Sequence, residues 1–364
     1  MKIVSDCRYV RVDHHDGISR YSSRITAALG RLAAASGHEV TMLICDERQL
    51  ALLPDLPWAM GPSPTGPGEP WVARRVNRLG PDVVFTPLQT MGTFGRRYRL
   101  VKTLHDLIYH RHRTPPRDLP AFVRLLWRIY HLAWWPQRLL LDRADAVATV
   151  SATTKQLIAQ HRLTRRPVVV VANAADPAPA GARLDRPAPD PAGAGGRDLV
   201  YMGSFMPYKN VETLARALHE LPGYRLHLLS RIPSAARSRL EALAPAGALV
   251  VHDGTSEEEY RALLLSARAL VTASRDEGFG LPLVEAMVLG TPVVVSDIPI
   301  FREIGGDAAL YAPADDPAGF AAGIRRLEDP DEWRVRSAAS VLQAAHFDWD
   351  RSAAALLELM ESLA

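Results

Sequence analysis

Short runs of β-branched and apolar residues alternate with helical stretches through most of this chain, and this alternation restricts the possible folds more than any other feature. The runs are four to six residues long and apolar throughout, which is typical of strands covered on both faces of a parallel sheet. Helices between successive strands supply the crossover connections that a parallel sheet requires. The pattern therefore predicts an α/β fold built from βα units.

The expected strands form two groups, on either side of one segment that lacks apolar periodicity. This segment, residues 176–197 (DPAPAGARLDRPAPDPAGAGGR), is rich in Pro, Ala and Gly, and we interpret it as a linker. The strands before it are expected at residues 2–5, 39–44, 82–86, 100–104, 146–150 and 168–171, and those after it at residues 199–203, 225–230, 248–251, 269–274 and 292–296.

The length of the chain also argues for two domains, since its 364 residues exceed the ~250 to 300 at which single cores stop growing. We expect Rossmann-like domains over residues 1–175 and 198–345, with the linker over 176–197 between them. Residues 346–364 read as an amphipathic helix that packs back on the first domain. Because open parallel sheets bind ligands at the carboxyl ends of their strands, the two sheets are expected to face each other across an inter-domain cleft.

Charge and composition exclude several classes of protein. The net charge is only +3, although residues 1–190 carry 27 Lys and Arg against 16 Asp and Glu. No uncharged apolar run is long enough to cross a bilayer, and Met1 leads into KIVSD and not into a secretory signal, so we expect a cytoplasmic protein. Cys7 and Cys45 are too few for a disulfide framework and lack the spacing of a zinc site. The βα pattern is not that of a nucleic-acid-binding module, so no nucleic-acid partner is expected.

The most informative segment is residues 274–306, SRDEGFGLPLVEAMVLGTPVVVSDIPIFREIGG, which follows a predicted strand. A Gly-Phe-Gly turn at 278–280 precedes a helix that we expect to begin about Leu281. The N-terminus of such a helix attracts phosphate groups through its free amides and dipole. The carboxylates of Glu277 and Glu285 are suited to accept hydrogen bonds from the hydroxyls of a sugar and a ribose. The segment predicts a nucleotide-sugar site, whereas two acids that face solvent near a helix start are the plain alternative.

A second segment, YMGSFMPYKNVETLARAL at residues 201–218, places a lysine at the mouth of a helix. A strand is expected to end at Gly203, and a helix to begin about Asn210, directly after Lys209. When a sugar leaves a nucleotide, negative charge builds on the departing phosphate, and a preorganised ammonium lowers the barrier by ~3 kcal/mol or more. Lys209 is the candidate for this role, with a solvated surface lysine as the alternative.

These two segments resemble a known family. The stretch EGFGLPLVE from Glu277 to Glu285, with GTPVVVSDIPIFREI downstream, resembles the E-x7-E motif of retaining glycosyltransferases of the GT-B fold, family 4 (glycosyl transferases group 1), and the pattern is mannosyltransferase-like. The resemblance implies that Glu277 contacts hydroxyls of the donor sugar, that Glu285 binds the ribose, and that the backbone amides of residues 278–281 reach the sugar and phosphate.

The segment at 201–218 is similar to the G-R-x4-K-N phosphate-binding motif of the same family, but Ser204 stands where Arg is common. A serine donates only a neutral hydrogen bond, so the second cation for the phosphates is unassigned and Arg275, Arg20 and Arg231 are all candidates. The expected donor-binding residues are Gly203, Ser204, Lys209, Arg275, Glu277, Gly278, Phe279, Gly280, Leu281 and Glu285.

Three places in the first domain extend the resemblance. Residues 12–25, VDHHDGISRYSSRI, resemble the first βα loop of the family, G-I-x-R-Y, with Gly17 in a turn before a helix that carries Arg20. His105 and Asp106 follow the fourth expected strand, and the pair resembles the cleft histidine of the family, which implies contact with the donor sugar. Ser151 is expected to cap the next helix, and it also lies at a strand end. The alternatives are a plain turn at Gly17 and a structural histidine at 105.

The expected catalytic residues are Lys209, Glu277 and His105, and the expected acceptor or cleft residues are Gly17, Arg20, His105, Asp106 and Ser151.

Residues 111–143 combine seven arginines and three tryptophans with only two aspartates. Basic residues beside Trp and Leu can dock a helix on an anionic membrane, which would suit a lipid-linked acceptor. The alternative is a long amphipathic helix whose tryptophans fill the core of the domain and whose arginines are solvated.

The resemblance implies a retaining hexosyltransferase that needs no enzyme nucleophile, and we expect it to need no metal and no cofactor. GDP-mannose is the favoured donor, with a UDP-sugar as the alternative, and the acceptor is a hydroxyl of a glycan or of a lipid-linked acceptor. We expect a cytoplasmic protein, and docking through residues 111–143 would place it at the inner face of the cell membrane. The competing interpretations are a glycosidase, a nucleotide-sugar epimerase of similar shape, and a non-catalytic nucleotide-sugar-binding protein.

Overall fold

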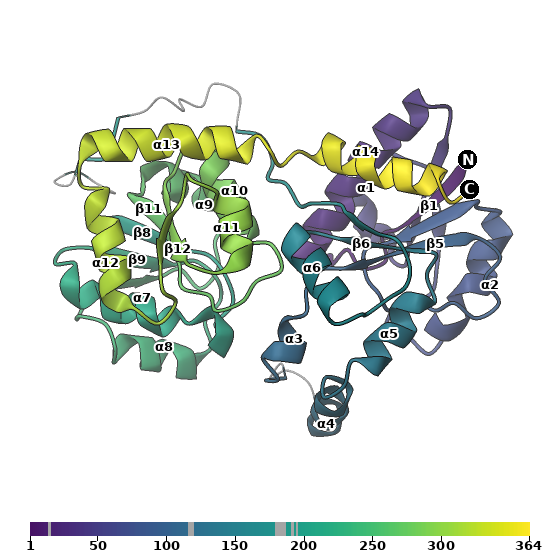
Figure 1. The fold of residues 1–364 in the computed structure, drawn as a ribbon, viewed down its shortest axis with the longest axis horizontal. Coiled ribbons are helices and arrows are strands. Elements are labelled where there is room, and N and C mark those ends of the chain that lie inside the picture. The colour runs from purple at the N-terminus through teal and green to yellow at the C-terminus, as the bar shows by residue number, and fades with distance from the viewer. Residues whose placement is uncertain (14–15, 116–119, 179–186, 191–192, 194–195) are drawn as a thin grey trace. The chain divides into compact units, whose positions relative to one another are not determined.

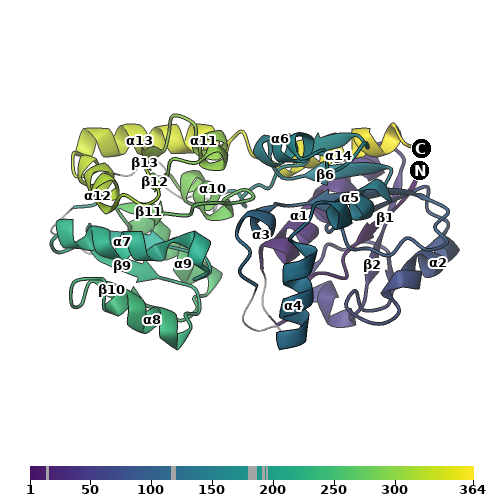
Figure 2. The same cartoon turned by 60° about the horizontal axis from the view of Figure 1, so that its bottom comes forward.

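The computed structural model describes residues 1–13, 16–115, 120–178, 187–190, 193 and 196–364, which form two compact units (Figure 1). The first unit contains Met1–Asn173 together with Asp348–Ala364, and the second contains Ala174–Phe347. Each unit is built on its own parallel sheet with helices on both faces (Figures 1 and 2). Both are Rossmann-like folds, in agreement with the fold class that the βα alternation predicts.

The first unit has a seven-stranded sheet in the order β3-β2-β1-β4-β5-β6-β7, and all its pairings are parallel. The six strands expected from the apolar runs are present, and their central residues are buried because helices cover both faces. The strands are β1 (Lys2–Asp6), β2 (Glu39–Ile44), β3 (Trp58–Met60), β4 (Val83–Thr86), β5 (Arg99–Leu104), β6 (Ala146–Thr149) and β7 (Val168–Val170). The sequence did not predict β3, a three-residue strand at the sheet edge without an apolar run.

The helices of the first unit include α14, which comes from the far end of the chain. This helix packs against α1 and β7, and Ser352 Oγ donates a hydrogen bond of 2.9 Å to the carbonyl oxygen of Ala172. Its buried face includes Leu356 and Met360. The described helices of this unit are α1 (Gly17–Ala35), α2 (Val72–Val76), α3 (Ile108–Arg111), α4 (Ala121–Tyr130), α5 (Trp135–Asp142), α6 (Ala152–Gln160) and α14 (Trp349–Glu361), with 3-10 helices η1 (Glu47–Leu52), η2 (Glu69–Trp71) and η3 (Asn77–Leu79).

The second unit has a six-stranded parallel sheet in the order β10-β9-β8-β11-β12-β13. Its strands are β8 (Asp198–Tyr201), β9 (Arg225–Leu228), β10 (Leu249–Val251), β11 (Ala269–Thr272), β12 (Val293–Ser296) and β13 (Leu310–Ala312). Its helices are α7 (Val211–Ala217), α8 (Ser234–Glu241), α9 (Glu257–Ser266), α10 (Leu281–Val288), α11 (Pro299–Gly305), α12 (Pro317–Arg326) and α13 (Pro330–Ala344), with η4 (Pro207–Lys209) and η5 (Leu218–Glu220). The three-residue edge strand β13 was not predicted.

The segment expected to be a separate linker, 176–197, falls within the second unit, and this corrects the predicted domain boundary. The reason is Arg268, which is fully buried and donates hydrogen bonds to the carbonyl oxygens of Pro189 (2.7 Å) and Gly196 (2.9 Å). A third bond of 2.9 Å reaches the carbonyl oxygen of Leu327. The composition of the segment shows that it has no apolar face to bury. It does not show that an arginine distant in the sequence donates hydrogen bonds to its backbone carbonyl oxygens. Residues 179–186, 191–192 and 194–195 of this segment lie outside the described residues.

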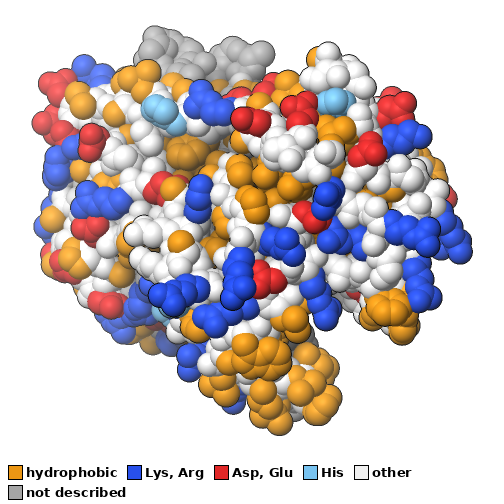
Figure 3. Space-filling model, turned by 45° about the vertical axis from the view of Figure 1, so that its right-hand side comes forward, with side chains coloured by type: hydrophobic (Ala, Val, Ile, Leu, Met, Phe, Trp, Pro, Cys, Tyr) orange, Lys and Arg blue, Asp and Glu red, His pale blue; other side chains and the backbone are white. Residues whose placement is uncertain are grey.

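The helix α4 presents its apolar side to the solvent, whereas the apolar face of a surface helix usually packs against the core. Phe122, Leu125, Leu126 and Ile129 share one helical face and are 70%, 56%, 49% and 55% exposed. The opposite face carries Trp127, whose ring lies 5.0 Å from that of Tyr109, measured between ring centroids. Figure 3 shows hydrophobic side chains gathered at the lower end of the first unit, where α4 lies.

The alternative interpretation of residues 111–143, one long helix with its tryptophans in the core, is therefore wrong about the single helix and about Trp135, although Trp134 packs against a core cluster. The described part of the segment forms separate helices, and Trp135 is 65% exposed. Residues 116–119, before α4, lie outside the described residues.

The role of Arg268 can be tested by replacing it with methionine, which keeps much of its volume but cannot donate hydrogen bonds. Two buried carbonyl groups and one partly buried carbonyl group then lose their partner, and we expect the second unit to lose about 3 kcal/mol or more of stability. Native-state hydrogen exchange of the amides in β8 and β11 measures this change. The control Arg216→Met, at an exposed position on α7, is expected to cost less than about 0.5 kcal/mol, and an equal effect of both variants would contradict the prediction.

Candidate functional site

The carboxyl ends of β8 and β11 bring a lysine and a glutamate into contact. The two strands are parallel neighbours in the centre of the second sheet, so the segments that follow them emerge at the same edge. Lys209 ends η4, after β8, and Glu277 follows β11. Their side chains form an ion pair between Lys209 Nζ and Glu277 Oε1, and are only 16% and 13% exposed. Two residues identified separately in the sequence thus belong to one cluster.

Asn210 fixes the position of Lys209, and the sequence analysis missed this role. Its backbone is left-handed, with φ of 52°, a conformation that Asn tolerates better than most residues. Asn210 Nδ2 donates a hydrogen bond of 2.6 Å to the carbonyl oxygen of Ala314, while Oδ1 accepts one of 3.1 Å from Thr213 Oγ1. The expected helix begins one residue later, at Val211, because Asn210 is the residue before it. The one signal in the sequence was an Asn at a helix boundary.

Glu277 is held in turn by Ser274. The Ser274 hydroxyl is buried and donates a hydrogen bond of 2.9 Å to Glu277 Oε1, the same oxygen that pairs with Lys209. This contact was also missed, although the spacing of three residues after a strand end was visible in the sequence. The carboxylate is therefore oriented by its own loop as well as by the lysine.

The helix α10 begins at Leu281, where it was expected, and its first turn is shaped by Gly280. Gly280 has φ of +97°, and a Cβ at this position would lie 3.0 Å from the ring of Phe301, so no larger residue fits without strain. No side chain among the described residues caps this N-terminus. The ring of Phe279 is buried, and its centroid lies 5.4 Å from that of the Phe347 ring. The helix start keeps the free amides that bind phosphate groups.

Glu285 lies inside α10 and accepts a hydrogen bond of 3.0 Å from the hydroxyl of Tyr260. Tyr260 belongs to α9 and is buried. Nothing in the sequence pattern pointed to this pair, because the two residues come from different helices. The tyrosine orients the carboxylate that the family motif assigns to a ribose.

The arginine candidates for a second phosphate contact differ in their surroundings. Arg275 is engaged within its own unit, since Nη2 donates to Asp315 Oδ1 (2.5 Å) and to Asn210 Oδ1 (2.9 Å). Arg231 follows β9 and is exposed, and the neighbouring Ser230 Oγ accepts a hydrogen bond of 3.2 Å from the amide of Gly203. The loop that carries Arg231 therefore touches the loop in which Ser204 replaces the family arginine. Arg20 lies on α1 of the first unit and is partly buried.

In the first unit, the loop after β1 differs from its prediction at Gly17. This residue is the first of α1 and not part of a turn before it, and its φ is not positive, so the backbone does not require glycine there. The cap is Asp16, whose Oδ1 accepts a hydrogen bond of 2.8 Å from the amide of Ser19. A Cβ on Gly17 would meet no atom within 4 Å. Histidines 14 and 15 lie outside the described residues.

His105 and Asp106 follow β5, as expected. His105 Nε2 lies 2.8 Å from the carbonyl oxygen of Pro87, and burial lowers the pKa of the imidazole to about 4. A neutral ring that donates from Nε2 presents Nδ1 as an acceptor. Asp106 Oδ1 accepts a hydrogen bond of 3.0 Å from the amide of Ile108 at the start of α3. Ser151 caps α6, since its Oγ accepts a hydrogen bond of 3.1 Å from the amide of Thr154.

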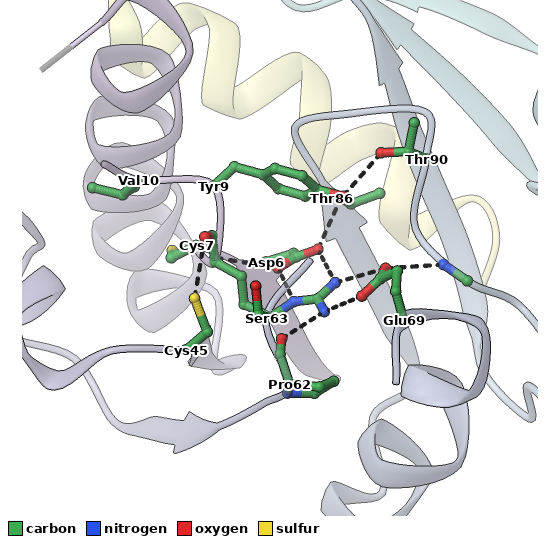
Figure 4. A network of polar contacts seen from close by, with 12 residues as sticks. Asp6, Cys7, Tyr9, Val10, Cys45, Pro62, Ser63, Glu69, Thr86 and Thr90 are labelled. Carbon is green, nitrogen blue, oxygen red and sulfur yellow. Dashed lines mark hydrogen bonds and ion pairs between the residues drawn. The ribbon is translucent and has the colours of Figure 1, made fainter. Parts of the chain in front are cut away.

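A buried ionic network at the carboxyl end of β1 was not visible in the sequence (Figure 4). Arg8 Nε donates to Asp6 Oδ1 at 2.8 Å, and Arg8 Nη1 donates to Glu69 Oε2 at 2.5 Å. Thr86 Oγ1 at the end of β4 donates to Asp6 Oδ2 at 3.1 Å, and the amide of Gly92 donates to Glu69 Oε1 at 3.1 Å. The network ties the loops after β1 and β4 to each other. It therefore stiffens the edge of the first sheet where His105 also lies.

The described part of the chain holds no group of three or more His, Cys, Asp or Glu residues arranged to bind a metal ion. None of its helices combines the length and apolarity needed to cross a membrane.

Comparison with known proteins agrees with this geometry. Residues 196–329 match the family described as "Glycosyl transferases group 1", and residues 22–178 match "Glycosyltransferase Family 4". The chain is 32% identical over 163 residues to the O-antigen chain mannosyltransferase B of Escherichia coli, covering 42% of each chain. It is 29% identical over 266 residues to the GDP-mannose:cellobiosyl-diphosphopolyprenol alpha-mannosyltransferase of Xanthomonas oryzae pv. oryzae, covering 65% of this chain and 66% of that one. The chain thus spans less than two thirds of the length of either relative.

Solved structures share the fold at lower identity. Sucrose-phosphate synthase from Thermosynechococcus elongatus superposes with a TM-score of 0.74 at 21% identity, covering 100% of this chain and 98% of that one. The Anabaena protein HepE in complex with UDP-glucose superposes with a TM-score of 0.69 at 16% identity, covering 100% of both chains. Together the two family models include every strand of the second sheet and every strand of the first sheet except β1. The chain is therefore a GT-B protein of glycosyltransferase family 4, the glycosyl transferases group 1.

Proposed function

We propose that this glycosyltransferase moves a hexose from a nucleotide-sugar to a hydroxyl of a lipid-linked glycan, with retention of anomeric configuration. The observation that carries the proposal is the contact of Lys209 with Glu277 beside the uncapped start of α10. The two mannosyltransferase relatives favour a mannosyl donor, GDP-mannose, and the UDP-glucose complex of HepE supports the nucleotide-sugar class more generally. The name of the Xanthomonas relative supports a diphosphopolyprenol-linked acceptor.

Lys209 exchanges its partner during the proposed reaction. In the free protein its ammonium group is neutralised by Glu277. A bound diphosphate offers the ammonium more negative charge than one carboxylate does, and this frees Glu277 to accept hydrogen bonds from sugar hydroxyls. The bond between the anomeric carbon and the phosphate oxygen then breaks, and the negative charge that develops on the phosphate lies beside Lys209. The acceptor oxygen attacks the anomeric carbon and its proton passes to the departing phosphate, so the step needs neither a metal nor an enzyme nucleophile.

Lys209→Ala and Glu277→Ala are each expected to lower turnover by about 10²-fold or more, because each removes one preorganised charged contact. Turnover is measured as release of nucleoside diphosphate from GDP-mannose, and from UDP-glucose in parallel. The control is Arg237→Ala, which breaks an exposed ion pair with Glu241 on α8. This control is expected to keep normal turnover, since exposed pairs contribute little. Normal turnover in both alanine variants would refute the assignment.

Arg231 is the arginine that we propose as the second phosphate contact in place of the missing family arginine. It is exposed and follows a loop that hydrogen-bonds to Gly203, whereas Arg275 is already held by Asp315 and Asn210. Ser204 is exposed and supplies at most a neutral hydrogen bond. A guanidinium at position 231 would complete the charge that a diphosphate needs.

Arg231→Ala is expected to weaken binding of GDP or UDP about tenfold, since a charge-assisted hydrogen bond contributes ~1.5 to 3 kcal/mol. Arg275→Ala is expected to weaken it less and to lower the melting temperature, because it breaks contacts within the unit. Isothermal titration calorimetry and a thermal melt of each variant separate the two effects. Arg231 is excluded if its alanine variant binds both nucleotides like the wild type.

We also propose that the exposed face of α4 docks on an anionic membrane at the cytoplasmic side. The residues from 119 to 141 contain no Asp or Glu and three arginines, Arg124, Arg128 and Arg138. The apolar face continues beyond the helix at Leu132 and Trp135, which are 62% and 65% exposed. Apolar side chains flanked by arginines match the acyl chains and anionic head groups of a bilayer surface. A lipid-linked acceptor would be reached from such a position.

Leu126→Glu combined with Ile129→Glu is expected to reduce pelleting with anionic phosphatidylglycerol vesicles at least tenfold, because both charges lie in the docking face. Sedimentation at low and high salt, with neutral phosphatidylcholine vesicles alongside, separates the apolar from the electrostatic contribution. The matched control is Leu342→Glu on α13, a leucine that is 71% exposed in the second unit. Concentration-dependent self-association without pelleting would instead assign the face to a second copy of the chain.

A further inference from the structure

A cavity of about 180 Å³ lies within the first unit, below the start of α1 and beside His105. Its apolar walls are formed by Ile18, Leu88 and Leu107, among others. Its polar lining comes from the segments after β4 and β5, from α3, and from the segment around α4 and α5. These polar residues are His105, Asp106, His110, His131 and Gln137, together with Gln89 and Tyr109.

Two of the polar residues in this lining are deeply buried and have a nitrogen with no hydrogen-bond partner in the described protein. His110 is 6% exposed and Gln137 is 2% exposed, and in each the unpartnered atom is Nε2. Burying an unsatisfied polar group costs free energy, so such groups are rare unless a ligand or ordered water serves them. Both residues line the same cavity, which points to one shared occupant.

Gln137 has one unpartnered side-chain atom whichever way its amide group is oriented. The hydroxyl of Tyr130 lies 2.9 Å from Gln137 Oε1 and occupies that end of the amide. Exchanging the oxygen and nitrogen would turn Tyr130 into an acceptor and leave the oxygen unpartnered instead. In either orientation, one polar atom of this buried side chain has no hydrogen-bond partner in the described protein and can bond to a ligand.

The histidines of the lining are neutral and present acceptors. His131 Nδ1 lies 2.7 Å from the carbonyl oxygen of Trp127 and must donate to it, which leaves Nε2 as an acceptor. His105 Nε2 donates to Pro87 in the same way and leaves Nδ1. Burial lowers the pKa of His110 to about 4 and also lowers that of His131, so these rings carry no charge near pH 7.

Among the described residues, the lining offers neutral donors and acceptors together with one carboxylate, Asp106, and no Lys or Arg side chain. Sugar hydroxyls both donate and accept, so they match these groups, whereas a phosphate would face the Asp106 carboxylate. We propose that this cavity binds one neutral hexopyranosyl residue of the acceptor, with His110 and Gln137 as its buried hydrogen-bonding partners. The proposal rests on the transferase function and names the part of the acceptor that the first unit recognises.

A direct test uses the full chain with its histidine rings labelled with nitrogen-15. Methyl α-mannopyranoside, methyl α-glucopyranoside and methyl α-galactopyranoside are titrated into it, with inorganic phosphate as the anionic comparison. At least one glycoside is expected to shift the His110 Nε2 resonance saturably, with the millimolar affinity typical of a single sugar. Shifts caused by phosphate alone, or by none of the four probes, would overturn the proposal, and the second outcome would assign the cavity to water.

Two variants test the orphaned atoms themselves. His110→Phe and Gln137→Met keep most of the side-chain volume but remove the unpartnered nitrogen, and each is expected to weaken glycoside binding about tenfold. Glycoside affinity of these variants is read by saturation-transfer difference NMR, which does not need the His110 resonance. The matched control is Tyr98→Phe, which removes another buried and unpartnered atom, the Tyr98 hydroxyl, from a core cluster away from the cavity. This control is expected to leave glycoside binding unchanged.

Thermal melts of the variants distinguish a loss of glycoside binding from a loss of folding. Removing an unsatisfied polar atom should leave the melting temperature unchanged or raise it in His110→Phe and Tyr98→Phe, whereas Gln137→Met also removes the acceptor of the Tyr130 hydroxyl and is expected to lower it. Binding that weakens at an unchanged melting temperature supports a ligand contact. Unchanged glycoside affinity in both His110→Phe and Gln137→Met would overturn the proposal.

The readouts also separate this proposal from the transferase function. If wild-type protein releases no nucleoside diphosphate from any donor but still binds a glycoside through His110, the transferase assignment fails and the cavity remains a sugar site. If the donor turns over normally and the two cavity variants have wild-type kinetics toward every glycoside, the cavity assignment fails alone.

Discussion

The ion pair between Lys209 and Glu277 is the interaction on which the arrangement of the second unit depends. It joins the segments after two central strands, β8 and β11, and both partners are mostly buried. Each partner has its own support, since Asn210 fixes the backbone beside the lysine and Ser274 orients the carboxylate. A charge held in this way needs little reorganisation when a ligand takes the place of its partner. In the free protein, the lysine that we propose to bind phosphate is therefore neutralised by a carboxylate.

The central strands of both sheets could be predicted because strands buried on both faces read as continuous apolar runs. The edge strands β3 and β13 could not, since three residues at a sheet edge carry no such run. The start of α10 was predicted to the residue because Gly280 and Pro282 are local signals. The partners of Glu285 and Asn210 were not, because Tyr260 and Ala314 approach them only in the folded unit.

The segment 111–143 shows a different limit of sequence analysis. A helical pattern such as that of α4 reveals that one face is apolar, but it does not reveal whether that face points inward or outward. In α4 the face with Trp127 meets the aromatic rings of the first unit, and the aliphatic face is left exposed. The contacts of Trp127 with Tyr109, and of Tyr130 with His110 and Gln137, set this orientation. The usual assumption that tryptophans mark the core was half right, because Trp135 lies outside it.

The two faces of the segment 111–143 differ in their chemistry. Its outer side is aliphatic and basic, and its inner side contributes His131 and Gln137 to a polar cavity beside His105. A molecule with a hydrocarbon chain and a sugar head carries the same two chemistries, so a single short stretch of chain can meet both of its ends. The cost of this arrangement is an exposed apolar surface and two unsatisfied buried nitrogens, and both are features that a bound ligand would compensate. The proposed amphiphilic glycan acceptor would supply both contacts at once, which neither a free sugar nor a bare membrane would do.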